Sequence, residues 1–174
     1  STKKFISIIV GGSNRHYNFS KEVVLNLTKE IINLKKNYPK YDFLVISSRR
    51  TGKENINLFK KKLHNIAYVW DGKNSNPYGY ALLKSKFFIV TSDSTSMISE
   101  CSLTGKPIYV FYLPEKRKSK RLNYFHKEFE KLKITRKFSS KIDFKEWKYK
   151  TLDEAKRISG ILKKRIIEEY NNES

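Results

Sequence analysis

Short apolar runs alternate along the chain with longer stretches in which apolar residues recur every three or four positions. The short runs have the length of buried β-strands, and the longer stretches have the spacing of amphipathic helices. Alternation of this kind is typical of βαβ units, in which right-handed crossovers build a parallel sheet. Strands are expected at residues 5–10, 43–46, 66–70, 87–90 and 107–112, and helices at residues 20–36, 54–63, 78–83, 94–103 and 123–132.

About five strands with their helices fit one doubly wound, mostly parallel Rossmann-like sheet of the α/β class. A chain of 174 residues forms one well-packed domain and is too short for two ordinary ones. We assign residues 1–150 to this domain. Residues 151–174 open with the capping-box pattern Thr151-Leu152-Asp153-Glu154 and are expected to form a terminal helix that packs on the same domain.

The charge balance favours anionic partners, because 37 basic residues face 17 acidic ones and the net charge is +20. Most of the basic residues are lysines scattered among Asn and Ile, which is not the dense tract expected of a nucleic-acid binder. Strands buried on both faces would also leave no platform on which bases could stack, so nucleic acid is disfavoured as a partner. The basic run at residues 115–121 is expected to be a solvated loop and is a candidate contact with an anionic membrane surface.

Cysteine usage and apolar run lengths bear on the cellular compartment. Cys101 is the single cysteine, so no internal disulfide can form, and no Cys/His spacing resembles a zinc site. No apolar run approaches the ~20 residues of a transmembrane helix, and no leader precedes the first strand. We therefore expect a cytoplasmic protein, with peripheral membrane contact as an open alternative.

Four polar clusters follow predicted strands, at the ends where open parallel sheets bind their ligands. We expect them to meet along one edge of the sheet. The clusters are Gly11-Gly12-Ser13, the run at 47–51 that contains Ser48, Arg49 and Arg50, the loop at 70–78 with Asn76 and Tyr78, and the run at 92–96 with Asp93, Ser94, Thr95 and Ser96.

The run at residues 90–100 is the most informative of these clusters. A buried strand breaks there into hydroxyl side chains and then opens a helix, whose first amides lack internal acceptors and favour an anion. Asp93 or Ser94 is an ordinary N-cap residue, but one cap explains only one hydroxyl. An arginine pair at a neighbouring strand end is a good phosphate clamp. The sequence therefore predicts a phosphate or nucleotide site.

The order of the motifs resembles that of a known family. Gly11-Gly12, the run at 48–51, the turn at 76–78 and the block at 93–107 with Gly105-Lys106-Pro107 together resemble the mitochondrial-fission "elongated mitochondria" family. Its bacterial members are often labelled nucleoside-diphosphate-sugar epimerases. The element at 100–107 is also similar to the donor-binding half of glycosyltransferases of the B fold, with Cys101 in place of the usual Ala.

The resemblance covers residues 5–147 and implies a partner domain. Family members carry another αβ domain before this one, so the resemblance implies that the chain is the carboxy-terminal half, as a fragment or a shortened form. The missing amino-terminal domain would then be its partner.

The resemblance implies that the ligand is a nucleotide-sugar donor. Its diphosphate would rest on the start of the helix at Ser94–Ser96, and Arg49 or Arg50 would neutralise it. Glu100 would accept hydrogen bonds from the ribose hydroxyls, and the loop at 69–72 would border the base. The glycine pair with Ser13 would permit close approach of the backbone to the sugar or phosphate.

Catalysis is not expected from this chain alone. In B-fold transferases the general base normally comes from the other domain, and His16 is the one histidine expected near the cleft. No Asp-x-Asp pair follows a suitable strand, so we expect no metal and no cofactor. The leading hypothesis is a glycosyltransferase-like donor-binding domain, and the alternative is a non-enzymatic interaction module of the same fold.

Overall fold

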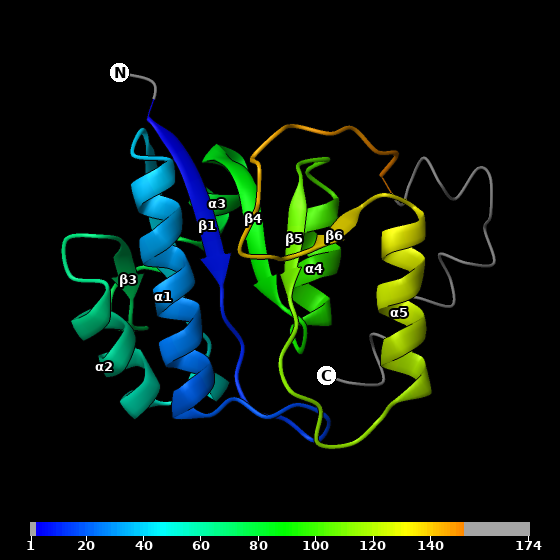
Figure 1. Cartoon of the computed structure of the whole chain (residues 1–174), viewed down its shortest axis with the longest axis horizontal. Coiled ribbons are helices and arrows are strands. Elements are labelled where there is room, and N and C mark those ends of the chain that lie inside the picture. Colours follow the sequence, from blue (N-terminus) through cyan, green and yellow to red (C-terminus); the bar gives the residue numbers. More distant parts are fainter. Residues whose placement is uncertain (1–2, 152–174) are drawn as a thin grey trace.

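The computed structural model describes residues 3–151 and contains one six-stranded sheet (Figure 1). The strand order is β3-β2-β1-β4-β5-β6, and all neighbouring strands run parallel. The strands are β1 (Lys4–Ile9), β2 (Tyr41–Ile46), β3 (Tyr68–Trp70), β4 (Ser85–Thr91), β5 (Ile108–Phe111) and β6 (Thr135–Lys137). This topology confirms the predicted doubly wound α/β fold. The order in which the chain adds strands switches between β1 and β4, and such sheets bind ligands at this switch point.

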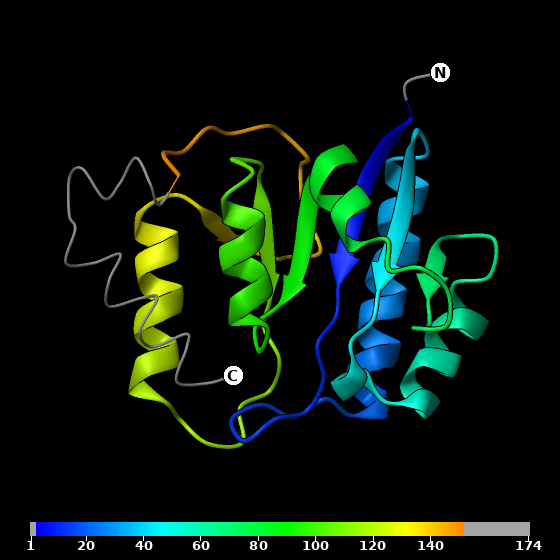
Figure 2. The ribbon, with the colours of Figure 1, turned by 180° about the vertical axis from the view of Figure 1, so that it is seen from behind.

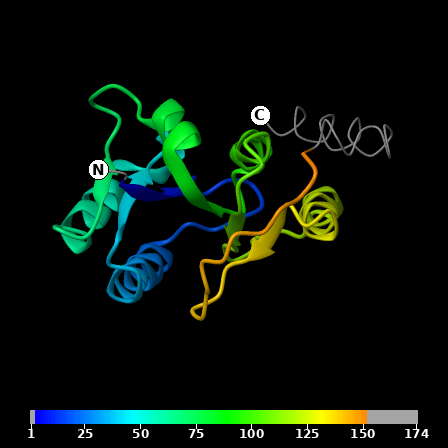
Figure 3. The same ribbon diagram turned by 90° about the horizontal axis from the view of Figure 1, so that it is seen from above.

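Helices cover both faces of the sheet. Figure 1 shows α1 (Lys21–Asn37) and α2 (Lys53–Lys62) in front of the strands, and Figure 2 shows α3 (Tyr78–Lys84) and α4 (Thr95–Ser102) on the opposite face. Seen from above in Figure 3, α5 (Lys120–Lys131) lies beyond α4, near the β6 end of the sheet. A short 3₁₀ helix, η1 (Arg49–Thr51), directly precedes α2.

The strands separate two apolar cores. Ile6 and Ile8 of β1 pack with α1 and α2, whereas Phe88 and Val90 of β4 pack with α4 and α5, and all four side chains are fully buried. On the first face, the irregular segment at residues 138–149 completes the cover beside α1, because Phe144 packs into the first core. Burial on both faces explains why the strands read as continuous apolar runs.

The structure corrects the expected number of strands from about five to six. The additional strand, β6, pairs with β5 at the sheet edge and has the sequence Thr135-Arg136-Lys137. Two exposed basic residues in three positions give no apolar run, so the pattern could not reveal it. The helix at 123–132 begins earlier than expected, at Lys120, after the N-cap Ser119.

The expected helix at residues 151–174 lies outside the described residues, apart from its first position. Within residues 3–151, no helix has the length and apolar character that crossing a membrane would require.

Candidate functional site at the carboxyl edge of the sheet

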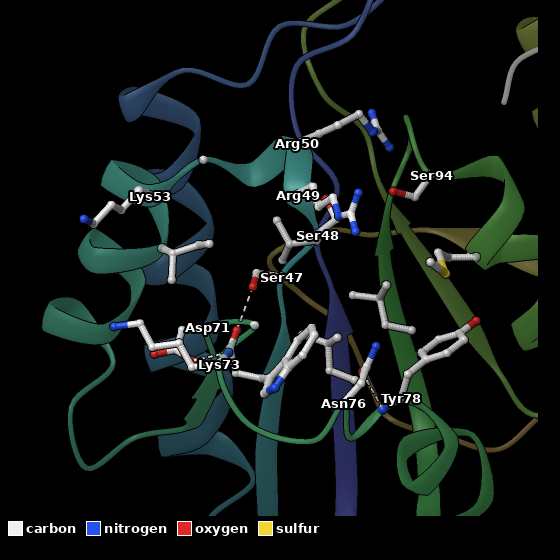
Figure 4. Close-up of a pocket in the computed structure, with 18 of the residues that line it drawn as sticks. Ser47, Ser48, Arg49, Arg50, Lys53, Asp71, Lys73, Asn76, Tyr78 and Ser94 are labelled. Atoms are coloured by element: carbon white, nitrogen blue, oxygen red, sulfur yellow. Dashed lines mark hydrogen bonds between the residues drawn. The ribbon is translucent and has the colours of Figure 1, made fainter.

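A cavity of about 680 Å³ opens at the carboxyl edge of the sheet, where β1, β2 and β3 end. Its wall combines η1, the start of α2, the loop between β3 and α3, and the start of α4. Three of the four predicted clusters reach this wall, through Ser48, Arg49, Arg50, Asn76, Tyr78, Ser94 and Ser96. Residues that are 48 positions apart in the sequence thus line one cavity (Figure 4).

Arg49 supplies positive charge to this cavity. Its side chain is exposed, and within residues 3–151 it forms no ion pair. In Figure 4 the side chain lies between η1 and Ser94. A guanidinium group in this position can donate parallel hydrogen bonds to a phosphate.

Arg50 differs from Arg49, because its charge is already paired inside the protein. Its Nη1 atom lies 2.9 Å from Oδ2 of Asp93, whose side chain has no exposed surface. The same Oδ2 accepts a hydrogen bond from the amide of Gly12 at 3.0 Å. Asp93 therefore ties η1, the end of β1 and the segment before α4 together below the cavity wall.

The glycine pair allows the strand ends to approach one another. A Cβ atom on Gly11 would overlap Asp93 Oδ2 and Ser94 Oγ, and one on Gly12 would overlap the carbonyl oxygen of Arg50. The hydroxyl of Thr51 also donates to the Gly11 carbonyl at 2.5 Å. The space beside both glycines is thus filled by protein atoms, and neither residue lines the cavity.

The start of α4 faces the cavity with hydroxyl groups. Ser94 is the N-cap residue, but its side chain makes no capping hydrogen bond, and its Oγ lies 3.5 Å from Asp93 Oδ2. Ser96, in the first turn, also lines the wall, whereas Thr95 is buried and does not. The first amides of a helix have no acceptor within the helix, so this end suits an anion.

Two aromatic residues, Trp70 and Tyr78, also line the cavity. The Ser47 hydroxyl donates to the carbonyl oxygen of Trp70 at 2.7 Å, and the Trp70 indole donates to the carbonyl oxygen of Asn74 at 3.1 Å. The Asn76 side-chain oxygen accepts from the Tyr78 amide at 3.0 Å, which starts α3. The indole hydrogen bond holds the Trp70 ring, and the Asn76 hydrogen bond fixes the backbone from which the Tyr78 ring projects.

Glu100 does not line the cavity. It is exposed, one turn further along α4, and accepts a hydrogen bond from the Tyr78 hydroxyl at 2.5 Å. Burial, followed by the contacts with Cys101 and Glu100, raises the pKa of Tyr78 well above its usual value, so the phenol remains the donor. The carboxylate that was expected to accept hydrogen bonds from ribose hydroxyls is thus already bonded to Tyr78.

Two further predicted residues also lie off the wall. Ser13 is exposed, and its Oγ accepts a hydrogen bond from the Phe19 amide at 2.8 Å within the β1–α1 loop. His16 belongs to the same loop, where its carbonyl oxygen accepts from the Lys116 amide at 2.8 Å. Neither side chain is among those that line the cavity.

Two lysines of the wall were not predicted from the sequence. Lys53 is the first residue of α2, and Lys73 lies in the β3–α3 loop; Figure 4 shows both on the side of the cavity opposite Ser94. Lys53 directly follows the polar run at 47–52, and this was the only sequence feature that could have placed it at the cavity. Asp71, which also lines the cavity, forms an ion pair with Lys60. Within the described part of the chain, no group of three His, Cys, Asp or Glu side chains could hold a metal ion.

Two curated proteins are similar to the chain in sequence. The uncharacterized protein RP120 of Rickettsia prowazekii is 32% identical over 166 residues, which are 92% of this chain and 46% of that protein. The mitochondrial fission protein ELM1 of Arabidopsis thaliana is 27% identical over 154 residues, which are 87% of this chain and 35% of that protein. The chain thus spans less than half the length of these relatives.

Solved structures share the fold. The UDP-GlcNAc 2-epimerase of Neisseria meningitidis, solved with UDP-GlcNAc bound, matches 98% of this chain and 35% of its own with a TM-score of 0.53 and 17% identity. The peptidyl-cysteine decarboxylase EpiD matches 89% of this chain and 97% of its own with a TM-score of 0.53 and 14% identity. Identities this low establish the architecture alone.

The family is established by a match in sequence over nearly the whole chain. The model of the mitochondrial fission ELM1 family matches residues 1–166, which covers the whole sheet and all four polar clusters. This match, together with the two relatives, confirms the resemblance inferred from the motifs, and the chain belongs to the mitochondrial fission ELM1 family.

Proposed function

We propose that the cavity at the carboxyl edge binds the nucleoside diphosphate part of a nucleotide sugar. The observation that carries this proposal is that Arg49, the hydroxyl-lined start of α4 and the ring of Trp70 line one cavity. The diphosphate would lie between Arg49 and Ser94–Ser96, and the base would lie against Trp70 and Tyr78. The epimerase structure with UDP-GlcNAc bound indicates the ligand to test first.

The charges in the wall favour a ligand of this class. Arg50 is neutralised by Asp93, and Asp71 is paired with Lys60, so these groups add little net charge. Arg49 then remains as the cation nearest to the start of α4 (Figure 4). A guanidinium group and free helix amides are the combination with which proteins hold phosphate.

The proposed function of this chain is binding, without turnover of its own. Among the described residues that line the cavity there is no histidine, and the one carboxylate, Asp71, already accepts a hydrogen bond from Lys60 in their ion pair. A general base must lie within hydrogen-bond reach of the proton it removes. We infer that any transfer chemistry needs groups from outside residues 3–151.

The test is isothermal titration calorimetry of the 174-residue chain with UDP and UDP-GlcNAc. Arg49→Ala should weaken binding about 10-fold to 100-fold, because a hydrogen bond to a charged group contributes about 1.5–3 kcal/mol. The affinity of Arg49→Lys should lie between those of wild type and Arg49→Ala, since lysine keeps the charge and loses the fork of donors. Lys40→Ala, an exposed cation at the opposite edge of the sheet, is the matched control. Absence of binding at millimolar nucleotide, or equal affinities of Arg49→Ala and wild type, would refute the proposal.

A further inference from the structure

Two loops meet at the carboxyl edge of the sheet and hold one another in place. The β1–α1 loop and the β5–α5 loop come together below the strand ends in Figure 1 and form an antiparallel bridge between Tyr17 and Glu115. The Asn18 amide donates to the Pro114 carbonyl at 2.8 Å, and the Lys116 amide donates to the His16 carbonyl at 2.8 Å. Backbone hydrogen bonds in both directions fix the paired loops as one unit.

The outer surface of these paired loops is strongly basic. Four exposed cations project from the two loops and a fifth from the first residue of α5, and we call this set the basic tip: Arg15, Lys116, Arg117, Lys118 and Lys120. Within residues 3–151 none of the five forms an ion pair, although Lys116 Nζ donates to the Asn14 carbonyl at 3.2 Å. Unpaired cations this closely spaced repel one another and favour a surface that carries several negative charges.

The basic tip and the candidate functional site both lie at the carboxyl edge of the sheet. Arg15 comes three residues after Gly12, whose amide donates to Asp93 at 3.0 Å below the cavity wall. Both features therefore belong to the same edge of the sheet.

We propose that the basic tip docks the carboxyl edge of this domain on an anionic lipid bilayer. The cations are spread over two loops and the start of α5, and a bilayer offers many phosphates at variable positions. Each nearby Lys or Arg contributes about a fivefold gain in affinity for an anionic bilayer. None of the exposed large apolar side chains in the described part of the chain lies on the basic tip; Tyr68 and Tyr80, for example, lie on β3 and α3. The tip thus lacks rings on which the bases of a single-stranded nucleic acid could stack. This docking does not depend on the proposed nucleotide function.

Co-sedimentation of the 174-residue chain with vesicles tests the proposal. We expect binding to vesicles that mix phosphatidylserine with phosphatidylcholine, and none to phosphatidylcholine alone. The double variant Arg117→Glu/Lys118→Glu should reduce binding about 25-fold or more, because it reverses two charges. The matched control is Lys40→Glu/Lys86→Glu, two exposed lysines at the opposite edge, which makes the same change in net charge.

Three outcomes would overturn the docking proposal. Wild type could fail to bind the anionic vesicles, or the control pair could reduce binding as much as the tip pair. Single-stranded RNA at equal phosphate concentration could displace the protein from the vesicles completely, which would make the tip a nucleic-acid surface. Urea denaturation of the tip variant verifies that it is folded, and a parallel titration of wild type with UDP keeps failure of the docking distinct from failure of the nucleotide site.

Discussion

At the scale of single residues, the carboxyl edge depends on a buried carboxylate. Asp93 accepts from Gly12 and Arg50, which come from two other segments, and its side chain has no exposed surface. The sequence pattern predicts all three residues at one edge but does not indicate their partners. The arginine pair shows the difficulty: Arg49 and Arg50 are adjacent and chemically identical, and the pairing of Arg50 with Asp93 depends on a contact across 43 positions. Such a contact leaves no local pattern in the sequence.

The close approach at Gly12 leads to a first prediction. Gly12→Ala should destabilise the fold by about 1–3 kcal/mol, because the new methyl group would overlap the Arg50 carbonyl and come within 2.7 Å of the Thr51 amide. Gly79→Ala is the control, since no atom lies within 4 Å of its Cβ position and helix α3 should gain about 0.5–1 kcal/mol. Urea denaturation measures both free energies. Equal stability of Gly12→Ala and wild type would show that the strand ends can move apart.

His126 gives a prediction about pH. The side chain is 4% exposed, its Nε2 donates to the Ser92 carbonyl at 3.0 Å, and burial lowers its pKa from 6.5 to about 4. Between these pH values the unfolded chain binds a proton that the folded chain does not, so stability is complete above pH 6.5 and declines as the pH falls toward 4. From pH 7.5 to pH 5 this one group should remove about 2 kcal/mol from the free energy of unfolding.

Urea denaturation at several pH values measures this decline. His126→Gln should flatten the pH profile in that interval, because glutamine has no proton to gain there. The exposed His64, changed to Gln in the same way, is the control, and its profile should follow that of the wild type. A steep decline in the His126 variant would assign the pH dependence to other groups.

At the scale of elements, apolar spacing located the long helices and the buried strands. The helix expected at 20–36 is α1 (Lys21–Asn37), and the strand expected at 43–46 is the buried end of β2. Short elements at the sheet edges were harder to predict, because an edge strand needs few apolar residues. Strand β3 covers only Tyr68–Trp70 of the expected 66–70, and β6 was missed altogether.

Helix caps give a prediction that compares two serines. Ser119 accepts a hydrogen bond from the Leu122 amide at 3.2 Å, so Ser119→Ala should cost about 1 kcal/mol of stability. Ser94 caps α4 without such a bond, so Ser94→Ala should cost less in urea denaturation and should weaken UDP binding instead. The reverse pattern, with a large loss of stability and unchanged affinity, would make the Ser94 hydroxyl purely structural.

At the scale of the whole molecule, the chain carries a net charge of +20 and places part of that charge at the edge that also holds the cavity. Composition predicted an anionic partner, and the topology predicted the edge at which the polar clusters meet. Neither composition nor topology could predict which cations remain unpaired. Arg49 remains unpaired, whereas Arg50 pairs with Asp93 and Lys60 pairs with Asp71. That distinction arises only when the strands are assembled.

The excess of positive charge predicts opposite effects of salt on folding and on binding. Repulsion among the cations destabilises the compact state, so the free energy of unfolding should rise as NaCl increases from 0.01 to 0.1 M and the Debye length falls from about 30 to about 10 Å. Urea must be the denaturant, because guanidinium would itself screen the charges. UDP affinity should fall over the same range, since screening weakens attraction to Arg49. If stability also fell, the ion pair of Arg50 with Asp93 would outweigh the general repulsion, and Arg50→Ala would then remove most of the salt dependence.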